Sequence, residues 1–162
     1  MKIAFFNSIA LNYGGGAEKY FITTANEMAR NGHSVSIINL NKSFYRKLTI
    51  ALSIYYVSNS TAVKYTDAEI KSMLKGVEWL RPSFGELKRT LSNFDVIYSK
   101  DEILDLGILK LIGHKSLPPI IVGVHTPIYY SISDSFRSKI HNFLYLSPLY
   151  KWLLKDCAFI HV

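Results

Sequence analysis

The sequence predicts an α/β fold in three layers, in which helices flank a central, mostly parallel sheet. Short apolar runs of strand length recur along the chain, and segments with helical periodicity separate them. The chain has 162 residues, of which 49% are hydrophobic, so it can bury a core of its own as one domain. Its single cysteine, Cys157, excludes a disulfide framework and a cysteine-based zinc site.

The N-terminal part of the chain predicts a strand–helix–strand unit, the repeating unit of parallel sheets. An apolar run at residues 3–7 is typical of a buried strand, and a loop that ends in three glycines at 14–16 follows it. Residues 17–30 carry apolar side chains at three- and four-residue spacing, which predicts a helix that ends at Asn31-Gly32. Residues 35–40 are rich in β-branched side chains and predict the second strand.

The rest of the chain continues the alternation of strands and helices. Residues 44–56 fit either an aromatic amphipathic helix or a loop with a strand. Because the last apolar strand would need neighbours and covering helices, we expect these residues to be the first part of a longer protein. In chain order, the sequence predicts a strand at 61–65, helices at 67–75 and 83–91, a strand at 95–98, a helix at 102–112, a strand at 120–124, helical sequence at 136–154 interrupted by Pro148, and a strand at 158–162.

Positive charge is unevenly distributed. The net charge is +7, and residues 42–90 hold nine basic against four acidic side chains, while residues 135–162 hold four against one. This is typical either of ordinary solvated faces or of an anionic partner, and the lack of a nucleic-acid-binding motif argues against nucleic acid. The basic aromatic segment at 42–47, continued by Tyr55-Tyr56, fits either a core stripe or a membrane interface. With no secretory leader or spanning run recognised, we expect a cytoplasmic protein, peripheral at the inner face of the plasma membrane where that segment binds lipid.

The glycine loop is the first candidate site. Gly15 and Gly16 precede a predicted helix, and backbone N–H groups at a helix N-terminus favour phosphate. The loop does not match a dinucleotide fingerprint, because Lys19 stands where its third glycine belongs and Asn39 stands where an acidic partner of the ribose is expected. A flexible strand-to-helix turn remains the alternative, with Glu18 stabilising the helix dipole.

His125 is the second candidate, because it directly follows the apolar run at 120–124. Ligands of open α/β sheets bind at the carboxyl ends of the strands, where a histidine can donate to an anionic oxygen or move a proton. The alternative is a histidine that satisfies loop carbonyls. Lys100 and Asp101 follow another strand and could face the same cleft, although Asp101, Glu102 and Asp105 also fit helix N-terminal charges. The other histidines are weaker candidates with structural interpretations: His33, His114, His141 and His161.

In order and spacing, these motifs resemble the N-terminal domain of GT-B-fold glycosyltransferases of the group 1, family 4-like class. The resemblance covers nearly the whole chain. It rests on the strand at 2–7, Gly15-Gly16-Ala17-Glu18, Gly32-His33-Ser34-Val35, Asp95-Val96-Ile97-Tyr98-Ser99, Ile121-Val122-Gly123-Val124-His125 and an apolar strand near residue 160.

The resemblance implies that residues 1–162 are the Rossmann-like, acceptor-side domain of a two-domain hexosyltransferase. The nucleotide-sugar is then a co-substrate held mainly by a C-terminal domain absent from this chain, and transfer to a lipid-linked, saccharide or other acceptor is retaining and needs neither cofactor nor metal. Gly15 and Gly16 would approach the donor diphosphate or sugar, and His125 would act at the reacting centre. Glu18, Lys100 and Asp101 are assigned to the acceptor. The chain alone is expected to be inactive.

Two alternatives come from other classes. A non-catalytic Rossmann-like module would bind an anionic metabolite or a partner protein at the same strand ends. Half of a nucleotide-dependent oxidoreductase is disfavoured by the mismatch at Lys19.

Overall fold

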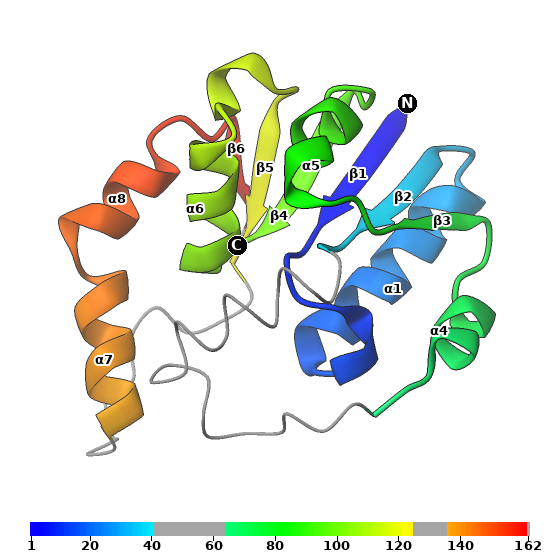
Figure 1. Ribbon diagram of the computed structural model, residues 1–162, viewed down its shortest axis with the longest axis horizontal. Coiled ribbons are helices and arrows are strands. Elements are labelled where there is room, and N and C mark those ends of the chain that lie inside the picture. The colour runs from blue at the N-terminus through cyan, green and yellow to red at the C-terminus, as the bar shows by residue number, and fades with distance from the viewer. Residues whose placement is uncertain (41–63, 125–135, 162) are drawn as a thin grey trace.

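The computed structural model describes residues 1–40, 64–124 and 136–161, which form a six-stranded parallel sheet in the order β3-β2-β1-β4-β5-β6 (Figure 1). The strands are β1 (Lys2–Phe6), β2 (Ser34–Ile38), β3 (Val77–Leu80), β4 (Val96–Lys100), β5 (Ile120–Gly123) and β6 (Phe159–His161). The helices are α1 (Gly16–Arg30), α4 (Asp67–Met73), α5 (Phe84–Leu91), α6 (Ile103–Leu111), α7 (Phe136–Tyr145) and α8 (Pro148–Leu154), with short 3-10 turns η1 (Leu11–Tyr13) and η2 (His114–Ser116). The predicted three-layer α/β fold is confirmed, and every described strand pair is parallel.

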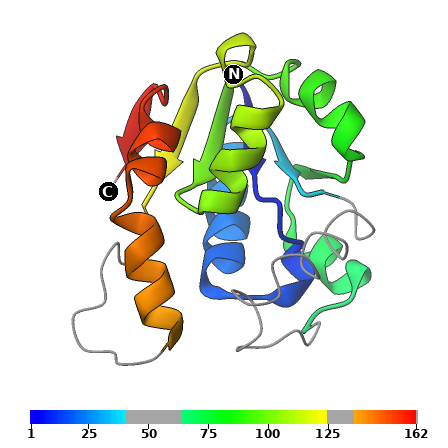
Figure 2. The same ribbon diagram turned by 60° about the vertical axis from the view of Figure 1, so that its left-hand side comes forward.

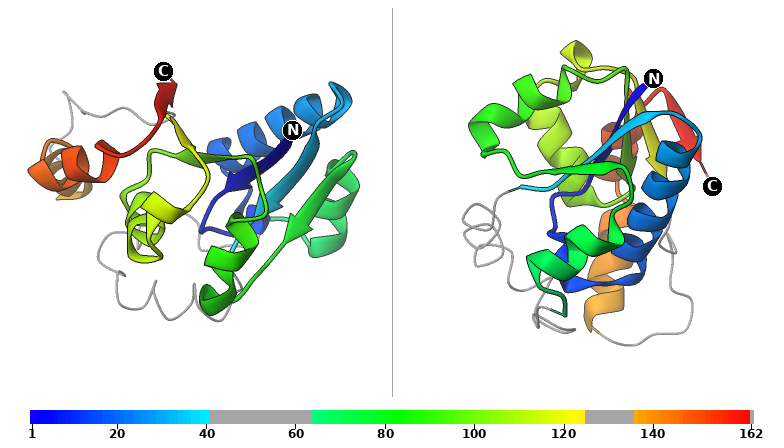
Figure 3. Two further views of the ribbon diagram at one scale, coloured as in Figure 1. Left: turned by 90° about the horizontal axis from the view of Figure 1, so that it is seen from above. Right: turned by 90° about the vertical axis from the view of Figure 1, so that its right-hand side faces the viewer.

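Helices cover both faces of the sheet (Figures 2 and 3). β1 supplies side chains to both sides, since Phe5 packs with Phe21 of α1 while Phe6 packs in the cluster that holds Leu87 of α5. All three aromatic rings are at most 2% exposed. The first face is covered by α1 and α4, and the second by α5, α6, α7 and α8. This arrangement explains why β1 reads as an unbroken apolar run rather than an alternating one.

Most helix boundaries follow local signals in the sequence. Asn31 closes α1, and Gly32 adopts a left-handed φ of 84°, which a residue with a side chain adopts only at a cost. Pro148 separates α7 from α8 by standing at the first position of α8, where its missing N–H is not needed. Thr66 begins α4 with a capping box to Glu69.

The prediction of a strand at 61–65 is wrong for Lys64 and Tyr65, its two described residues, which are not in a strand. The third strand is β3 instead, which pairs in register with β2 from Val35↔Val77 to Ile38↔Leu80. The four residues of β3 lie between two predicted helices, and their sequence shows no strand pattern of its own. Its strand conformation depends on backbone pairing with β2, which is a long-range contact.

Two sequence predictions lie outside the described residues: the basic aromatic segment at 42–56 and His125. Among the helices that the structure describes, none has both the length and the apolar character needed to cross a bilayer.

Candidate functional site

Three strands bring polar residues to one edge of the sheet. β1, β4 and β5 are neighbours, and their registers pair Phe6 with Ser99 and Lys100 with Gly123. The backbone N–H of Asp101 continues this ladder by donating to the carbonyl of Gly123 at 3.1 Å. Since parallel strands end at the same edge, the loop after β1 and the residues after β4 and β5 meet there.

A buried ion pair lies at this edge. The Nζ atom of Lys100 is 3.6 Å from Oε1 of Glu18, and the Nδ2 atom of Asn7 donates to the same oxygen at 3.2 Å. Lys100 is 3% exposed and Glu18 is 7% exposed, so water screens their interaction little. Burial by itself lowers the pKa of Lys100, but the carboxylates of Asp105, Glu102 and Glu18 outweigh it and raise the pKa above its ordinary value. Lys100 therefore stays positively charged.

Asp105 ties the loop after β1 to the first turn of α6. Its Oδ1 atom accepts hydrogen bonds from the backbone N–H of Ser8, at 2.9 Å, and from the Ser8 hydroxyl. Its Oδ2 atom is buried and accepts no hydrogen bond from any described residue. Burial raises the pKa of Asp105 to about 6, although Lys100 and the Ser8 hydroxyl oppose the shift. The carboxyl group thus titrates close to neutrality.

The three glycines of the loop have different surroundings. Gly14 has a left-handed φ of 60°, and a Cβ there would lie 2.5 Å from the ring of Tyr65. A Cβ on Gly15 would lie 2.4 Å from Oε2 of Glu18, the carboxylate that Lys100 neutralises. A Cβ on Gly16 would meet nothing within 4 Å. The first two glycines are thus explained by contacts within the chain, whereas Gly16 faces open space.

Asn39 fixes the loop from the side of β2. Its Nδ2 atom donates to the carbonyls of Asn7 and Ile9, each at 2.7 Å, and Nε1 of Trp79 donates to its Oδ1 atom at 2.6 Å. Asn39, which stands where a dinucleotide-binding protein would carry an acid, is therefore occupied in holding the backbone.

Residues 14–162 match the family model described as Glycosyltransferase Family 4. The chain belongs to glycosyltransferase family 4. A search of curated proteins found no match.

In this family 4 domain, five of the predicted site residues lie at one edge of the sheet. Gly15 and Gly16 begin α1, Glu18 follows in its first turn, and Lys100 and Asp101 end β4 and begin the loop after it. Glu18, Lys100 and Asp101 are buried, and Glu18 and Lys100 contact each other. His125, predicted as catalytic, lies outside the described residues; β5, which ends two positions before it, ends at this edge.

Sequence reasoning missed three residues of the candidate site. Asn7 and Ser8 are polar residues that directly follow the apolar β1, and both are 0% exposed. Asp105 fitted a helix N-terminal charge and in fact bonds to Ser8, 97 positions away. A signal existed for the first two, because polar residues at a strand end are buried only where they form hydrogen bonds.

We expect the Asp105→Asn variant to change how stability depends on pH. The pKa of Asp105 is about 6 in the folded domain and 3.8 as the model value, so its contribution to stability is full below pH 3.8 and is lost as the pH rises through about 6. Relative to the variant, the wild type should become less stable by at most about 3 kcal/mol of unfolding free energy as the pH rises over this range, because the pKa differs by about two units between the two states. Urea denaturation at a series of pH values measures it. A wild-type-to-variant difference that stays constant with pH would contradict the assignment.

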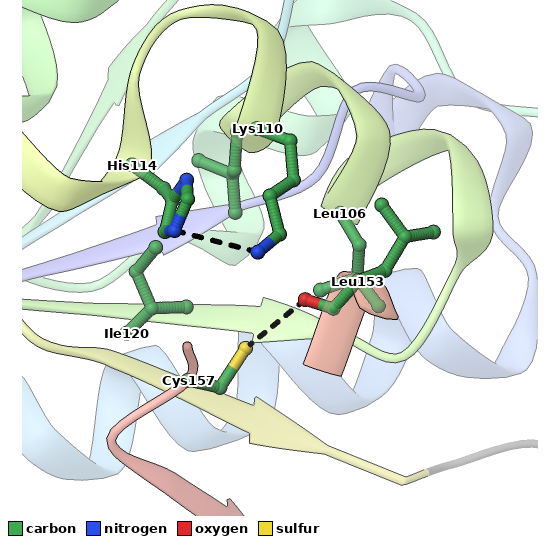
Figure 4. Close-up of a pocket in the computed structure, with 7 residues that line it drawn as sticks. Leu106, Lys110, His114, Ile120, Leu153 and Cys157 are labelled. Carbon is green, nitrogen blue, oxygen red and sulfur yellow. Dashed lines mark hydrogen bonds between the residues drawn. The ribbon is translucent and has the colours of Figure 1, made fainter. Parts of the chain in front are cut away.

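A second polar cluster, formed by Lys110, His114 and Asp156, lies at the opposite edge of the sheet, where β5 begins. Lys110 and His114 also line a pocket there, together with Leu106, Ile120, Leu153 and Cys157 (Figure 4). The Nζ atom of Lys110 is 2.6 Å from Oδ2 of Asp156, and Nε2 of His114 is 2.9 Å from the same oxygen. Hydrogen bonds from Lys110 and His114 lower the pKa of Asp156, whereas burial raises the pKa of the Cys157 thiol. These contacts tether the end of α6 to the connection between α8 and β6. Among the described residues, no three His, Cys, Asp or Glu side chains gather closely enough to hold a metal ion.

Proposed function

We propose that this domain forms the acceptor side of an enzyme that transfers a hexose from a nucleotide-sugar to a lipid-linked, saccharide or other acceptor. In this proposal, a second domain binds the nucleotide-sugar. The transfer is retaining and independent of a metal or cofactor. The observation that carries it is the opening of α1, where Gly16 faces open space beside the buried ion pair of Glu18 and Lys100.

The start of α1 suits a developing negative charge. Gly15 caps the helix without a side-chain hydrogen bond, so no side chain of the cap residue accepts from the first N–H groups of α1. These groups and the helix dipole attract anionic oxygens. A departing nucleoside diphosphate gains negative charge in the transition state, and fixed N–H donors stabilise such charge without reorganising. Gly16 lets the diphosphate or the sugar come close, because it carries no Cβ.

Lys100 makes this site compatible with an anion. Glu18 lies in the first turn of α1, where its carboxylate would repel a diphosphate if it were left unpaired. The ammonium group of Lys100 compensates that charge within the protein. Since both side chains are buried and contact each other, we assign Glu18 and Lys100 to positioning the glycine turn, and leave Asp101, at the start of the next loop, as the nearest candidate for the acceptor.

We assign His125 to the reacting centre. It follows β5 by two residues, and β5 ends beside Lys100 at the edge that holds the glycine turn. A histidine there has the chemistry to donate a hydrogen bond to the donor sugar or to move the proton of the acceptor hydroxyl.

Mass-spectrometric detection of products tests this function. The full-length protein is incubated with a panel of nucleotide-sugars and with lipid-linked and saccharide acceptors. We expect one donor to yield a product heavier by one hexose, residues 1–162 alone to give no product, and His125→Ala to lower the rate by about 100-fold, as loss of a general acid or base does. Binding of an anionic metabolite without any transfer would instead favour a non-catalytic module. Turnover by residues 1–162 alone would contradict the two-domain proposal.

A further inference from the structure

The two helices α7 and α8 and the turn between them carry four exposed apolar side chains, which we name the α7–α8 face. It consists of Phe143, Leu146, Leu149 and Trp152, which are 76%, 55%, 46% and 54% exposed. Phe143 lies on α7, Leu149 and Trp152 lie on α8, and Leu146 lies between these two helices, which Figure 1 shows at the outer edge of the molecule. Large apolar side chains that are exposed together often mark an interaction site, and four of them within residues 143–152 indicate a partner.

The inward side of the same helices already forms the core. Tyr145, Tyr150 and Leu153 are each 3% exposed and belong to the cluster under β4 and β5. His141 stacks on Tyr145 with ring centroids 4.2 Å apart. Packing within this domain therefore buries these side chains and leaves the four of the α7–α8 face largely exposed, with Nζ of Lys110 4.9 Å from the centroid of the Trp152 ring.

The charges around the α7–α8 face point to an anionic partner. Lys139, Lys151 and Lys155 are exposed, and none of them forms an ion pair with another described residue. Residues 136–155 contain four basic and no acidic side chains. Aromatic and leucine side chains flanked by lysines are the composition with which helices lie in the headgroup region of a bilayer.

The helix α7, which carries Phe143 of this face, also contacts a residue next to the candidate site. The Tyr145 hydroxyl donates to Glu102 at 3.4 Å, and Glu102 directly follows Asp101 at the carboxyl edge of the sheet. In Figures 1 and 2, α7 lies toward the end of the molecule at which β1, β4 and β5 terminate.

We propose that the α7–α8 face docks on the surface of an anionic lipid bilayer. Docking there would bring the carboxyl edge of the sheet to the headgroups, where the sugar-accepting group of a lipid-linked acceptor lies. This inference rests on the proposed glycosyl transfer for the choice of acceptor, and it places the membrane contact on α7 and α8 rather than on the segment at 42–56.

Vesicle flotation of the full-length protein tests the docking. With phosphatidylcholine vesicles that contain about 30% phosphatidylglycerol, we expect binding that weakens as salt screens the charges, and little binding to phosphatidylcholine alone. Replacing the three lysines, Lys139, Lys151 and Lys155, with glutamine should weaken binding to the anionic vesicles by about 100-fold, since each lysine near such a surface favours binding by about 1 kcal/mol. Phe143→Ser combined with Leu146→Ser should weaken it by about tenfold or more.

Matched variants serve as controls because they make the same chemical changes elsewhere on the surface. Leu111 is 79% exposed at the end of α6, so Leu111→Ser removes an exposed apolar side chain outside the face. The charge control replaces three exposed lysines elsewhere with glutamine: Lys71, Lys75 and Lys115. Both controls should bind like the wild type, and circular dichroism should show that all variants are folded.

Three outcomes would overturn the inference: no binding to anionic vesicles, binding that the variants of the face leave unchanged, or self-association that the same variants abolish, which would identify a second copy as the occupant. Flotation requires no catalysis. If the protein does not bind vesicles but still glycosylates a soluble acceptor, this inference alone is rejected. If it binds vesicles but transfers no sugar, the proposed function is rejected.

Discussion

Replacing Lys100 with methionine is expected to destabilise the domain by about 3 kcal/mol at neutral pH, within the range for removing one partner of a buried ion pair. Methionine keeps the length of the side chain and removes its charge. The carboxylate of Glu18, 3.6 Å from Nζ of Lys100, would then be buried without a cation, and Asp105 would lose the charge that opposes its raised pKa. Urea denaturation of the variant and the wild type measures the difference.

Two variants separate the effect of charge from the effect of volume. Adding Asp105→Asn to Lys100→Met removes a carboxylate that the lysine compensated, so the double variant should recover part of the lost stability. Lys115 is exposed and makes no ion pair with a described residue, and Lys115→Met should change the unfolding free energy by no more than about 0.5 kcal/mol. A loss as small for Lys100→Met as for Lys115→Met would show that the buried cluster is not held by this charge.

The fold could be predicted from the sequence where local signals and burial agree. β1, β2, β4 and β5 are mostly buried and carry mainly apolar side chains, and Asn31-Gly32 and Pro148 mark helix ends through backbone geometry. β3 was missed because its side chains are only partly buried and its strand conformation depends on pairing with β2. The Ser36 hydroxyl donates to Glu78 across these strands at 3.1 Å, and no local sequence pattern predicts such a long-range contact.

The edge that holds the site could be predicted, but its internal contacts could not. Parallel strands share a carboxyl edge, so residues after β1, β4 and β5 had to gather there. Which side chains pair is decided by how α1 and α6 enter that edge. Glu18 and Asp105 both fitted a helix N-terminal charge, and only the folded chain shows that Glu18 pairs with Lys100 and that Asp105 accepts hydrogen bonds from Ser8.

The Gly16→Ala variant is expected to lower kcat/KM for the nucleotide-sugar by about 100-fold in the full-length protein while leaving its folding intact. The added methyl group meets nothing within 4 Å in the domain, and Gly16 is the first residue of α1, where alanine is tolerated. The methyl group would instead occupy the space through which the donor approaches the N–H groups of α1. A displacement of about 1 Å at a reacting centre costs rates of this order.

The most direct test of the account compares kcat/KM of Gly16→Ala with that of Gly107→Ala. Gly107 lies within α6, and a Cβ there also meets nothing within 4 Å, so the second variant makes the same chemical change in open space away from the glycine turn. We expect both variants to unfold at or above the wild-type urea concentration, Gly107→Ala to keep its activity, and Gly16→Ala to lose about 100-fold in kcat/KM. Equal activity of the two variants would contradict the claim that the donor is bound at the start of α1.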